Sequence, residues 1–274
     1  MNPLSIAFHR RLFLLGLIPL AAAAQTDPIT DVTLPGVTFA HLGQKPAAAA
    51  PTVLVFAMDR KTSLENASFA RGAWMLRSAG FFCVSLNMPA HGDDARQGED
   101  GLKGWSARLE RGENFVAAFT RQASTLLDFL TREGYSHPQK IAIIGISRGG
   151  FMALHTMAAD PRVTVVATLA PVTDLTAVRE FSSPTLHTIA ESLSVRLLIP
   201  RLAGRPIWVL IGNRDERVGT GHCIDVMQGL WAATPADLKT SPAELHVLPG
   251  EDHRQPPFSQ EKAVAWIRER LAGP

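Results

Sequence analysis

The sequence predicts an α/β fold with a mostly parallel central sheet flanked by helices. Apolar runs typical of buried strands alternate along most of the chain with amphipathic stretches typical of helices. Polar or glycine-rich residues follow several of these runs, where open α/β sheets carry their ligand-facing groups. The chain has 274 residues, 46% of them hydrophobic, which suffices for one sizeable core.

The predicted elements follow one another in a regular alternation. Strands are expected at residues 52–57, 82–86, 140–144, 163–169, 207–211 and 243–248. Helices are expected at residues 66–79, 115–133, 148–159, 219–232 and 260–271, with a further pair within 175–200. Gly134 and the Asp160-Pro161 pair mark helix ends. This order predicts crossover connections and a parallel sheet.

The first residues are predicted to be a targeting signal. A basic stretch ending in Arg10 and Arg11 precedes the short apolar run 12–20 and a small-residue cleavage site before Gln25. Residues 1–24 therefore read as a signal peptide that exports the protein to the periplasm or the medium, with no stable membrane association after cleavage. The arginine pair followed by Phe13 and Leu14 fits the twin-arginine route, and a Sec signal or an uncleaved anchor is the alternative.

Behind the signal, residues 25–51 are expected to form a leader and an Ala-Pro linker, with candidate short strands at 32–34 and 37–41. The main domain then occupies residues 52–274. No internal repeat interrupts it.

Composition excludes several classes of partner. The 27 basic and 25 acidic residues give a formal net charge of +2 without a basic block, so nucleic-acid binding is not predicted. None of the nine histidines has a partner at metal-ligand spacing, so no metal site is predicted. Cys83, in a strand, and Cys223, at a helix start, are expected to be free thiols. A small molecule is the expected partner.

One sequence motif indicates a candidate catalytic residue. Gly145-Ile146-Ser147-Arg148-Gly149-Gly150 follows the apolar run 141–144 and precedes a helical stretch, so it lies on a strand-to-helix turn. Such a turn exposes the serine hydroxyl as a nucleophile, and the backbone N–H of Arg148 is the first candidate donor to an oxyanion. The alternative is an ordinary glycine-rich turn.

A serine nucleophile needs a base and an acid that orients the base. Asp215 follows the expected strand 207–211 and is the candidate acid, with a helix-capping aspartate as the alternative role. Asp174, after the strand 163–169, is the main competitor, and Glu216 is too close in sequence to exclude.

His253 is the candidate base, because it lies in the loop after the strand 243–248. His246 is the competitor, but alternation places it within that strand, where a half-buried structural histidine is expected. His222 follows a Gly-Thr-Gly turn and is expected at the surface.

These motifs make the chain resemble an α/β-hydrolase of the dienelactone hydrolase and prolyl-oligopeptidase-like group. The resemblance rests on the motif around Ser147 and on four further segments, at residues 87–93 (with a Pro-Ala-His-Gly turn), 170–175, 211–218 and 250–253. It implies a Ser147, Asp215 and His253 triad, which has the chain order of this family, working through an acyl-enzyme without a cofactor. It also places a second oxyanion donor after the strand 52–57, at the N–H of Met58 or Asp59, although the usual His-Gly is absent there.

The predicted function is hydrolysis of a small carboxylic ester. Prolyl oligopeptidases carry a large N-terminal propeller, and no such domain fits before Thr52. A peptidase acting on short peptides and a non-catalytic exported binding protein are the alternatives.

Two segments are expected to cover the site, at residues 92–114 and 175–200. In the first, Trp105 either walls a substrate pocket or fastens its long loop to the body. The Arg148 side chain either meets an anionic substrate or points to solvent or a nearby acid.

Overall fold

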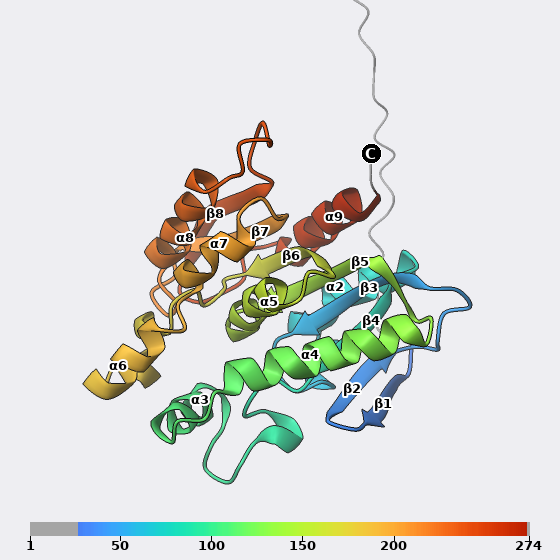
Figure 1. Cartoon of the computed structure of the whole chain (residues 1–274), viewed down its shortest axis with the longest axis horizontal. Coiled ribbons are helices and arrows are strands. Elements are labelled where there is room, and N and C mark those ends of the chain that lie inside the picture. Colours follow the sequence, from blue (N-terminus) through green and yellow to red (C-terminus); the bar gives the residue numbers. More distant parts are fainter. Residues whose placement is uncertain (1–26, 273–274) are drawn as a thin grey trace, which may run out of the picture.

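The computed structural model describes residues 27–272 and arranges them around one eight-stranded sheet with helices on both faces (Figure 1). The strand order is β1-β2-β4-β3-β5-β6-β7-β8. β2 pairs antiparallel with both β1 and β4, whereas all pairs from β4 through β8 are parallel. The predicted fold class, an α/β-hydrolase fold with a mostly parallel sheet, is therefore confirmed.

The strands are β1 (Ile29–Leu34), β2 (Val37–Leu42), β3 (Ala50–Phe56), β4 (Phe82–Leu86), β5 (Ser136–Ile146), β6 (Val163–Leu169), β7 (Ile207–Arg214) and β8 (Ala243–Glu251). The helices are α1 (Thr62–Glu65), α2 (Ala67–Ser78), α3 (Gly101–Glu110), α4 (Phe115–Arg132), α5 (Arg148–Ala159), α6 (Pro184–Glu191), α7 (Ile199–Leu202), α8 (Thr220–Ala232) and α9 (Ser259–Ala272). All six predicted strands of the main domain are present. The short α1 was not predicted.

The two faces of the sheet bury separate apolar clusters. Helices α2 and α9 pack together on one face. Helices α4, α5 and α8 cover the other face, where α4 and α5 lie across the middle of the sheet (Figure 1). Burial on both faces explains why the central strands are nearly continuous runs of Val, Ile and Leu.

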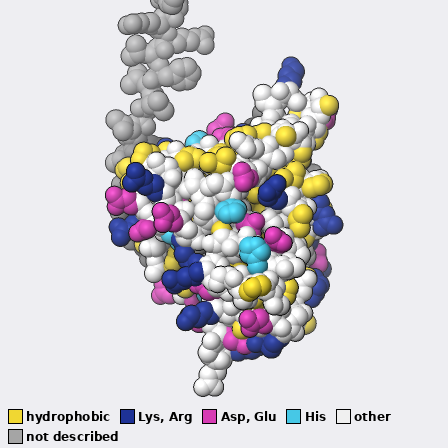
Figure 2. Space-filling view, turned by 90° about the vertical axis from the view of Figure 1, so that its left-hand side faces the viewer, with side chains coloured by type: hydrophobic (Ala, Val, Ile, Leu, Met, Phe, Trp, Pro, Cys, Tyr) yellow, Lys and Arg dark blue, Asp and Glu magenta, His cyan; other side chains and the backbone are white. Residues whose placement is uncertain are grey.

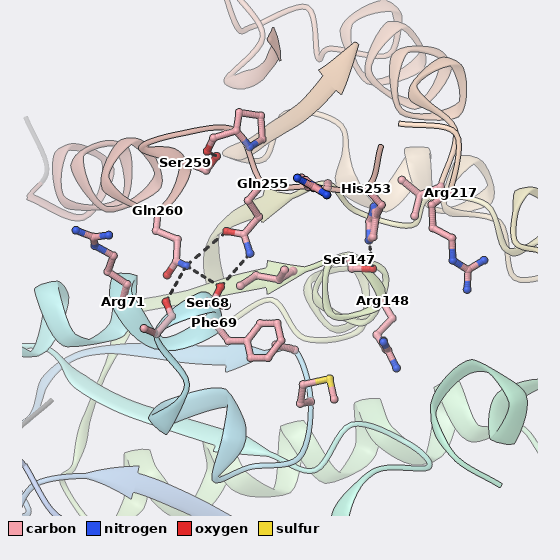
Figure 3. Close-up of a pocket in the computed structure, with 18 of the residues that line it drawn as sticks. Ser68, Phe69, Arg71, Ser147, Arg148, Arg217, His253, Gln255, Ser259 and Gln260 are labelled. Atoms are coloured by element: carbon pink, nitrogen blue, oxygen red, sulfur yellow. Dashed lines mark hydrogen bonds between the residues drawn. The ribbon is translucent and has the colours of Figure 1, made fainter. Parts of the chain in front are cut away.

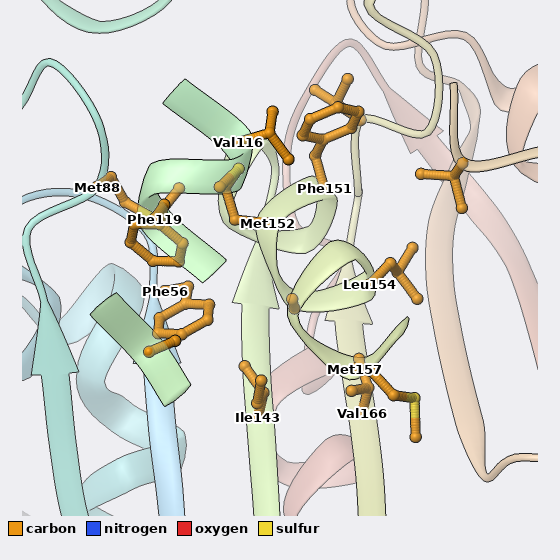
Figure 4. Close-up of a cluster of buried hydrophobic side chains, with 14 of the residues drawn as sticks. Phe56, Met88, Val116, Phe119, Ile143, Phe151, Met152, Leu154, Met157 and Val166 are labelled. Carbon is orange, nitrogen blue, oxygen red and sulfur yellow. The ribbon is translucent and has the colours of Figure 1, made fainter. Parts of the chain in front are cut away.

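Helix α5 is held in the centre of one cluster (Figure 4). Phe151, Met152, Leu154 and Met157 of α5 are each at most 1% exposed. They lie among side chains from the sheet and from α4, including Phe56, Phe119, Ile143 and Val166. Because α5 is buried on this scale, its N-terminus has a fixed position at the carboxyl edge of the sheet.

The N-terminal stretch expected as leader and linker contributes to the sheet. Both candidate short strands there are present, longer than predicted, as β1 and β2, and β3 already begins at Ala50. Phe39 and Leu42 of β2 are buried, so this hairpin is packed onto the domain. The predicted signal peptide, residues 1–24, lies outside the described residues. Within residues 27–272, no helix has the length and apolar character needed to cross a membrane.

The segment 92–114 differs from the expected long loop, because it contains the helix α3. Leu102, Trp105 and Leu109 fall on one face of this helix, at spacings of three and four residues, and all three are buried. The segment 175–200 contains α6 and short 3₁₀ turns, with α7 beginning at its end. Helices α3 and α6 contact each other beyond the carboxyl edge of the sheet.

Trp105 has the second of its two expected roles. Its side chain is 0% exposed, and its indole Nε1 donates a hydrogen bond of 2.6 Å to the carbonyl of Pro89. The ring also packs on Phe115 and Phe151, with centroid distances of 4.7 and 6.0 Å. Trp105 therefore fastens α3 to the body, and its assignment as a substrate-binding residue is wrong.

The cysteines are as expected, since Cys83 and Cys223 are free and buried. Burial raises the pKa of both thiols, that of Cys223 to about 12. Figure 2 shows basic and acidic side chains interspersed over the face that it draws. Among residues 27–272, no group of three His, Cys, Asp or Glu side chains is placed to hold a metal ion.

We predict that Trp105→Ala lowers the free energy of unfolding by about 3–5 kcal/mol, because it leaves a cavity and removes the bond to Pro89. Trp231→Ala is the matched control, because the Trp231 indole also donates to a backbone carbonyl, that of Ala243, but is 41% exposed. Its expected loss is less than half as large. Chemical denaturation of both variants measures the difference, and equal losses would contradict the role of Trp105.

Candidate active site

Ser147 lies on a strained turn between β5 and α5. Its φ of 56° and ψ of −118° fall in a region that L-residues other than glycine rarely adopt. The turn is held by hydrogen bonds from the Ser147 N–H to the Leu169 carbonyl and from the Val172 N–H to the Ser147 carbonyl, at 2.9 and 3.0 Å. These bonds join the turn to the end of β6 and the residues that follow it.

The glycines of the motif are required by close backbone approaches. A Cβ atom on Gly149 would lie 1.7 Å from the carbonyl oxygen of Phe56, at the end of β3. A Cβ atom on Gly145 would lie 2.6 Å from the Gly149 carbonyl oxygen, and one on Gly150 would lie 2.5 Å from Pro171. The sequence motif therefore reflects the tight fit of α5 against the strand ends.

The structure brings Ser147, His253 and Asp215 together in one hydrogen-bonded chain. His253 Nε2 lies 2.7 Å from Ser147 Oγ, and His253 Nδ1 lies 2.8 Å from Asp215 Oδ2. Because a carboxylate only accepts hydrogen bonds, Nδ1 carries the proton and Nε2 is free to accept from the serine hydroxyl. This is the tautomer that a general base requires.

The carboxylate of Asp215 is fixed from two sides. Its side chain is completely buried, directly after β7. Oδ1 accepts the backbone N–H groups of Arg217 and Val218 at 3.1 and 3.2 Å, while Oδ2 faces His253. The hydrogen bonds to both carboxylate oxygens restrict rotation of the Asp215 side chain, which therefore holds the His253 imidazole in a fixed orientation.

The competing residues lie elsewhere. Asp174 accepts bonds from the N–H and hydroxyl of Thr176 at the start of a 3₁₀ turn, and Glu216 is exposed. His246 is 42% exposed at its side chain and lies 3.6 Å from Glu244, whereas His222 lies 4.0 Å from Asp174. The structure places none of them in hydrogen-bond contact with Ser147.

The candidate oxyanion donors are unequal. As the first residue of α5, Arg148 has a backbone N–H without an acceptor inside its helix. The N–H of Met58, which lines the same pocket, donates to Ser63 Oγ at 3.0 Å. Asp59 does not line the pocket, and its carboxylate accepts the N–H groups of Lys61 and Thr62 at the start of α1.

Ser147 and His253 open onto a pocket of about 770 Å³ (Figure 3). Its walls come from the end of β3, the start of α2, the first turns of α3 and α5, and the chain from His253 into α9. Phe69 and Gln260 lie at one end of the pocket, and Arg148 and Arg217 lie at the other. Trp105 is not among the lining residues, whereas its helix neighbour Leu102 is.

The polar side chains at the α2 end are bonded to the protein. Gln255 and Gln260 both donate to the Ser68 carbonyl, at 2.9 and 2.8 Å, and Gln260 also accepts the Gly72 N–H at 2.7 Å. These side-chain amides therefore link α2 to the segment that leads into α9 and to the start of that helix. Phe69 and Pro256 also line this end of the pocket, so its surface is apolar or already hydrogen-bonded within the protein.

The sequence of this chain matches one broad family. The profile of the alpha/beta hydrolase family matches residues 67–273. The chain belongs to the alpha/beta hydrolase family. Acylamino-acid-releasing enzyme 2 of Oryza sativa subsp. japonica is 29% identical over 135 residues, which are 48% of this chain and 16% of that protein. The hydrolase thus matches only a small part of that relative's length.

Two solved structures illustrate the likeness of fold. A candidate dipeptidyl aminopeptidase IV from Bacteroides ovatus superposes with a TM-score of 0.69 at 14% identity, covering 89% of this chain and 36% of that one. A cold-adapted esterase from an Arctic intertidal metagenomic library superposes with a TM-score of 0.63 at 20% identity, covering 89% of this chain and 93% of that one.

Sequence reasoning missed much of the pocket of this hydrolase. Phe69, Gln255 and Gln260 were not singled out, and neither was the contact between His91 and Arg148. His91 lay within the Pro-Ala-His-Gly turn noted in the sequence, which was a usable signal. The others carry no local signal, because helix packing alone brings α2 and α9 together.

We predict that Gly149→Ala destabilises the hydrolase by about 3 kcal/mol or more, because the new Cβ would overlap a backbone carbonyl that cannot yield. Gly221→Ala is the control. Gly221 lies in α8, and a Cβ atom there would have no neighbouring atom within 4 Å, so this change should be neutral or stabilise by up to about 1 kcal/mol. Thermal and urea melts of both variants test the fit, and a Gly149→Ala protein as stable as wild type would refute it.

A second prediction concerns the acid. Asp215→Asn should lower kcat by about 10²- to 10⁴-fold, since an amide no longer fixes the required imidazole tautomer. Asp174→Asn should change kcat far less, because Asp174 bonds to Thr176 instead of His253. Steady-state kinetics on an activated ester compares the two, and the reverse order would identify Asp174 as the acid.

Proposed function

We propose that this hydrolase uses Ser147 to cleave a small carboxylic ester through an acyl-enzyme intermediate. The observation that carries the proposal is the continuous hydrogen-bonded chain from Ser147 through His253 to Asp215, opening onto the pocket. Each member makes the contact that its proposed role requires.

The proposed reaction has two halves. Ser147 Oγ attacks the ester carbonyl carbon while its proton moves to His253 Nε2, and the imidazolium is stabilised by Asp215. The carbonyl oxygen becomes an oxyanion that accepts the Arg148 N–H at the start of α5. The C–O bond to the alcohol then breaks as the alcohol takes the proton from His253. In the second half, a water molecule, deprotonated by His253, attacks the acyl-enzyme carbonyl carbon in the same way. The bond to Ser147 Oγ then breaks, which releases the carboxylic acid and restores the serine hydroxyl.

The second oxyanion donor is proposed to be the N–H of Met58. Met58 faces the pocket, and its donor bond to the Ser63 hydroxyl occupies it in the free protein. An oxyanion is a stronger acceptor than a neutral hydroxyl, so the developing charge would compete for this N–H during the reaction.

Two observations support an ester over a peptide. Peptide backbones require several free donors and acceptors along a groove, but Gln255 and Gln260 are already bonded to Ser68 and Gly72. In addition, the esterase named above is a structural neighbour of which this chain covers 93%. A peptidase acting on short peptides is the second candidate, favoured by the sequence match to an acylamino-acid-releasing enzyme.

We further propose that the protein acts outside the cytoplasm and that its partner is a small molecule. The proposed location rests on the basic, apolar and small-residue pattern of residues 1–24. The proposed partner rests on the size of the pocket, which is in the range of small-molecule sites.

The experiment that tests the function compares p-nitrophenyl esters with aminoacyl p-nitroanilides. We expect turnover of the esters, little turnover of the anilides, and labelling by a fluorophosphonate probe. Ser147→Ala should remove the labelling and lower ester turnover by about 10⁴- to 10⁶-fold at an unchanged melting temperature, because Ala retains the Cβ of the strained turn.

Other outcomes assign other functions. Faster cleavage of the anilides would favour the peptidase. Absence of both turnover and labelling would favour a non-catalytic binding protein. A Ser147→Ala variant that keeps a tenth of the activity would remove Ser147 from the mechanism.

A further inference from the structure

Arg148 differs from Arg71 and Arg217, two other arginines that line the pocket. Arg71 lies 3.0 Å from Glu261, and Arg217 donates two bonds of 2.8 and 2.9 Å to Glu180. Arg148, although partly buried, has no carboxylate of residues 27–272 within ion-pair distance of its guanidinium. Its charge is therefore not neutralised by the part of the chain that the structure describes.

The guanidinium is held in place by a neutral partner. Arg148 Nη1 lies 2.8 Å from Nε2 of His91, whose Nδ1 lies 2.9 Å from the Pro89 carbonyl. Since that carbonyl accepts only, Nδ1 carries the imidazole proton and Nε2 accepts from Arg148. His91 is 3% exposed, and burial lowers its pKa, which favours this neutral form.

The start of α3 leaves room for this arrangement. A Cβ atom on Gly101 would lie 2.6 Å from Arg148 Nη1, so the absence of a side chain there admits the guanidinium. With Nη1 engaged by His91, the Nε and Nη2 groups have no acceptor among the described residues. That pair of N–H groups forms a fork that matches the two oxygens of a carboxylate.

An uncompensated charge at this depth is unfavourable for the free protein. Burial lowers the pKa of Arg148, and the carboxylates of Asp100 and Glu180 offset this only from beyond contact distance. An anionic ligand group would compensate the charge, and the gain would be larger than at an exposed arginine because the site is partly desolvated.

We propose that Arg148 is a specificity-determining residue that binds a carboxylate of the substrate, so that the preferred substrates are esters bearing a free carboxylate. The proposal rests on the proposed ester hydrolysis at Ser147, the preceding residue, which lines the same pocket. A carboxylate is favoured over a phosphate because one unpaired positive charge balances a monoanion, and the nearby carboxylate of Asp100 would repel a second negative charge.

The test compares acidic and neutral esters of matched shape. Mono-4-nitrophenyl adipate against its methyl ester places the charge on the acyl side, and 4-acetoxybenzoate against 4-acetoxybenzamide places it on the alcohol side. Arg148 is expected to contact either the acyl or the alcohol side of the ester. For the pair whose carboxylate lies on that side, we expect the wild-type kcat/KM of the carboxylate ester to exceed that of its neutral partner by about 10- to 100-fold. Each ratio is taken within one protein, so a general loss of activity cancels.

Three variants identify the source of the preference. Arg148→Gln should lower the ratio to about one, and Arg148→Lys should retain only part of it, because lysine lacks the fork. Arg254→Gln is the matched control, because Arg254 also lines the pocket but is exposed. Its ratio should stay within about twofold of wild type. A ratio near one in wild type, or an equal loss in Arg254→Gln, would overturn the proposal.

A binding measurement separates this proposal from the proposed function. Calorimetric titration with benzoate, benzamide and phenyl phosphate requires no turnover, and we expect benzoate to bind most tightly and to lose this advantage in Arg148→Gln. If all esters are inert but this pattern holds, the carboxylate site stands and ester hydrolysis falls. If esters are cleaved but both the acid preference and benzoate binding are absent, hydrolysis stands and the carboxylate site falls. Tighter binding of phenyl phosphate would overturn the choice of a carboxylate.

Discussion

The contact between Gly149 and the carbonyl end of β3 is the constraint on which the site depends. It allows α5 to begin directly against the sheet, with Ser147 in its strained positive-φ conformation at the turn and the Arg148 N–H at the helix start. Phe151 and Met152, buried one turn further along α5, hold the helix there. A rigid core thus maintains a strained turn whose side chain faces a pocket.

The fold and the three residues Ser147, Asp215 and His253 could be predicted because each is indicated by a local sequence pattern. Apolar runs indicated the central strands, and the positions of Ser147, Asp215 and His253 directly after strands or in a loop before a helix predicted that they would meet at one edge of the sheet. Parallel strands bring their carboxyl ends together whatever the distance in sequence.

The features that were missed depend on helices that were not predicted or on contacts between distant segments. Nothing near Met58 in the sequence indicates that its N–H is bonded to the Ser63 hydroxyl, because α1 was not predicted. Trp105 was ambiguous since a tryptophan serves equally well in a pocket wall or in a core. Its segment was expected to be a loop, so the helical spacing with Leu102 and Leu109 that places it in the core was not recognised. In the same way, the amide contacts of Gln260 exist only once α9 lies against α2.

The separation of Ser147 from His253 has a consequence for the life of the protein. The two residues are 106 positions apart, and the last of the sheet strands, β8, must be in place before the imidazole can reach the hydroxyl. A chain that is still being synthesised, or that has lost its C-terminal strand and helix, has a serine without a base. Under the proposed mechanism, the hydroxyl is therefore activated only by complete folding, and a nascent chain would not yet transfer acyl groups.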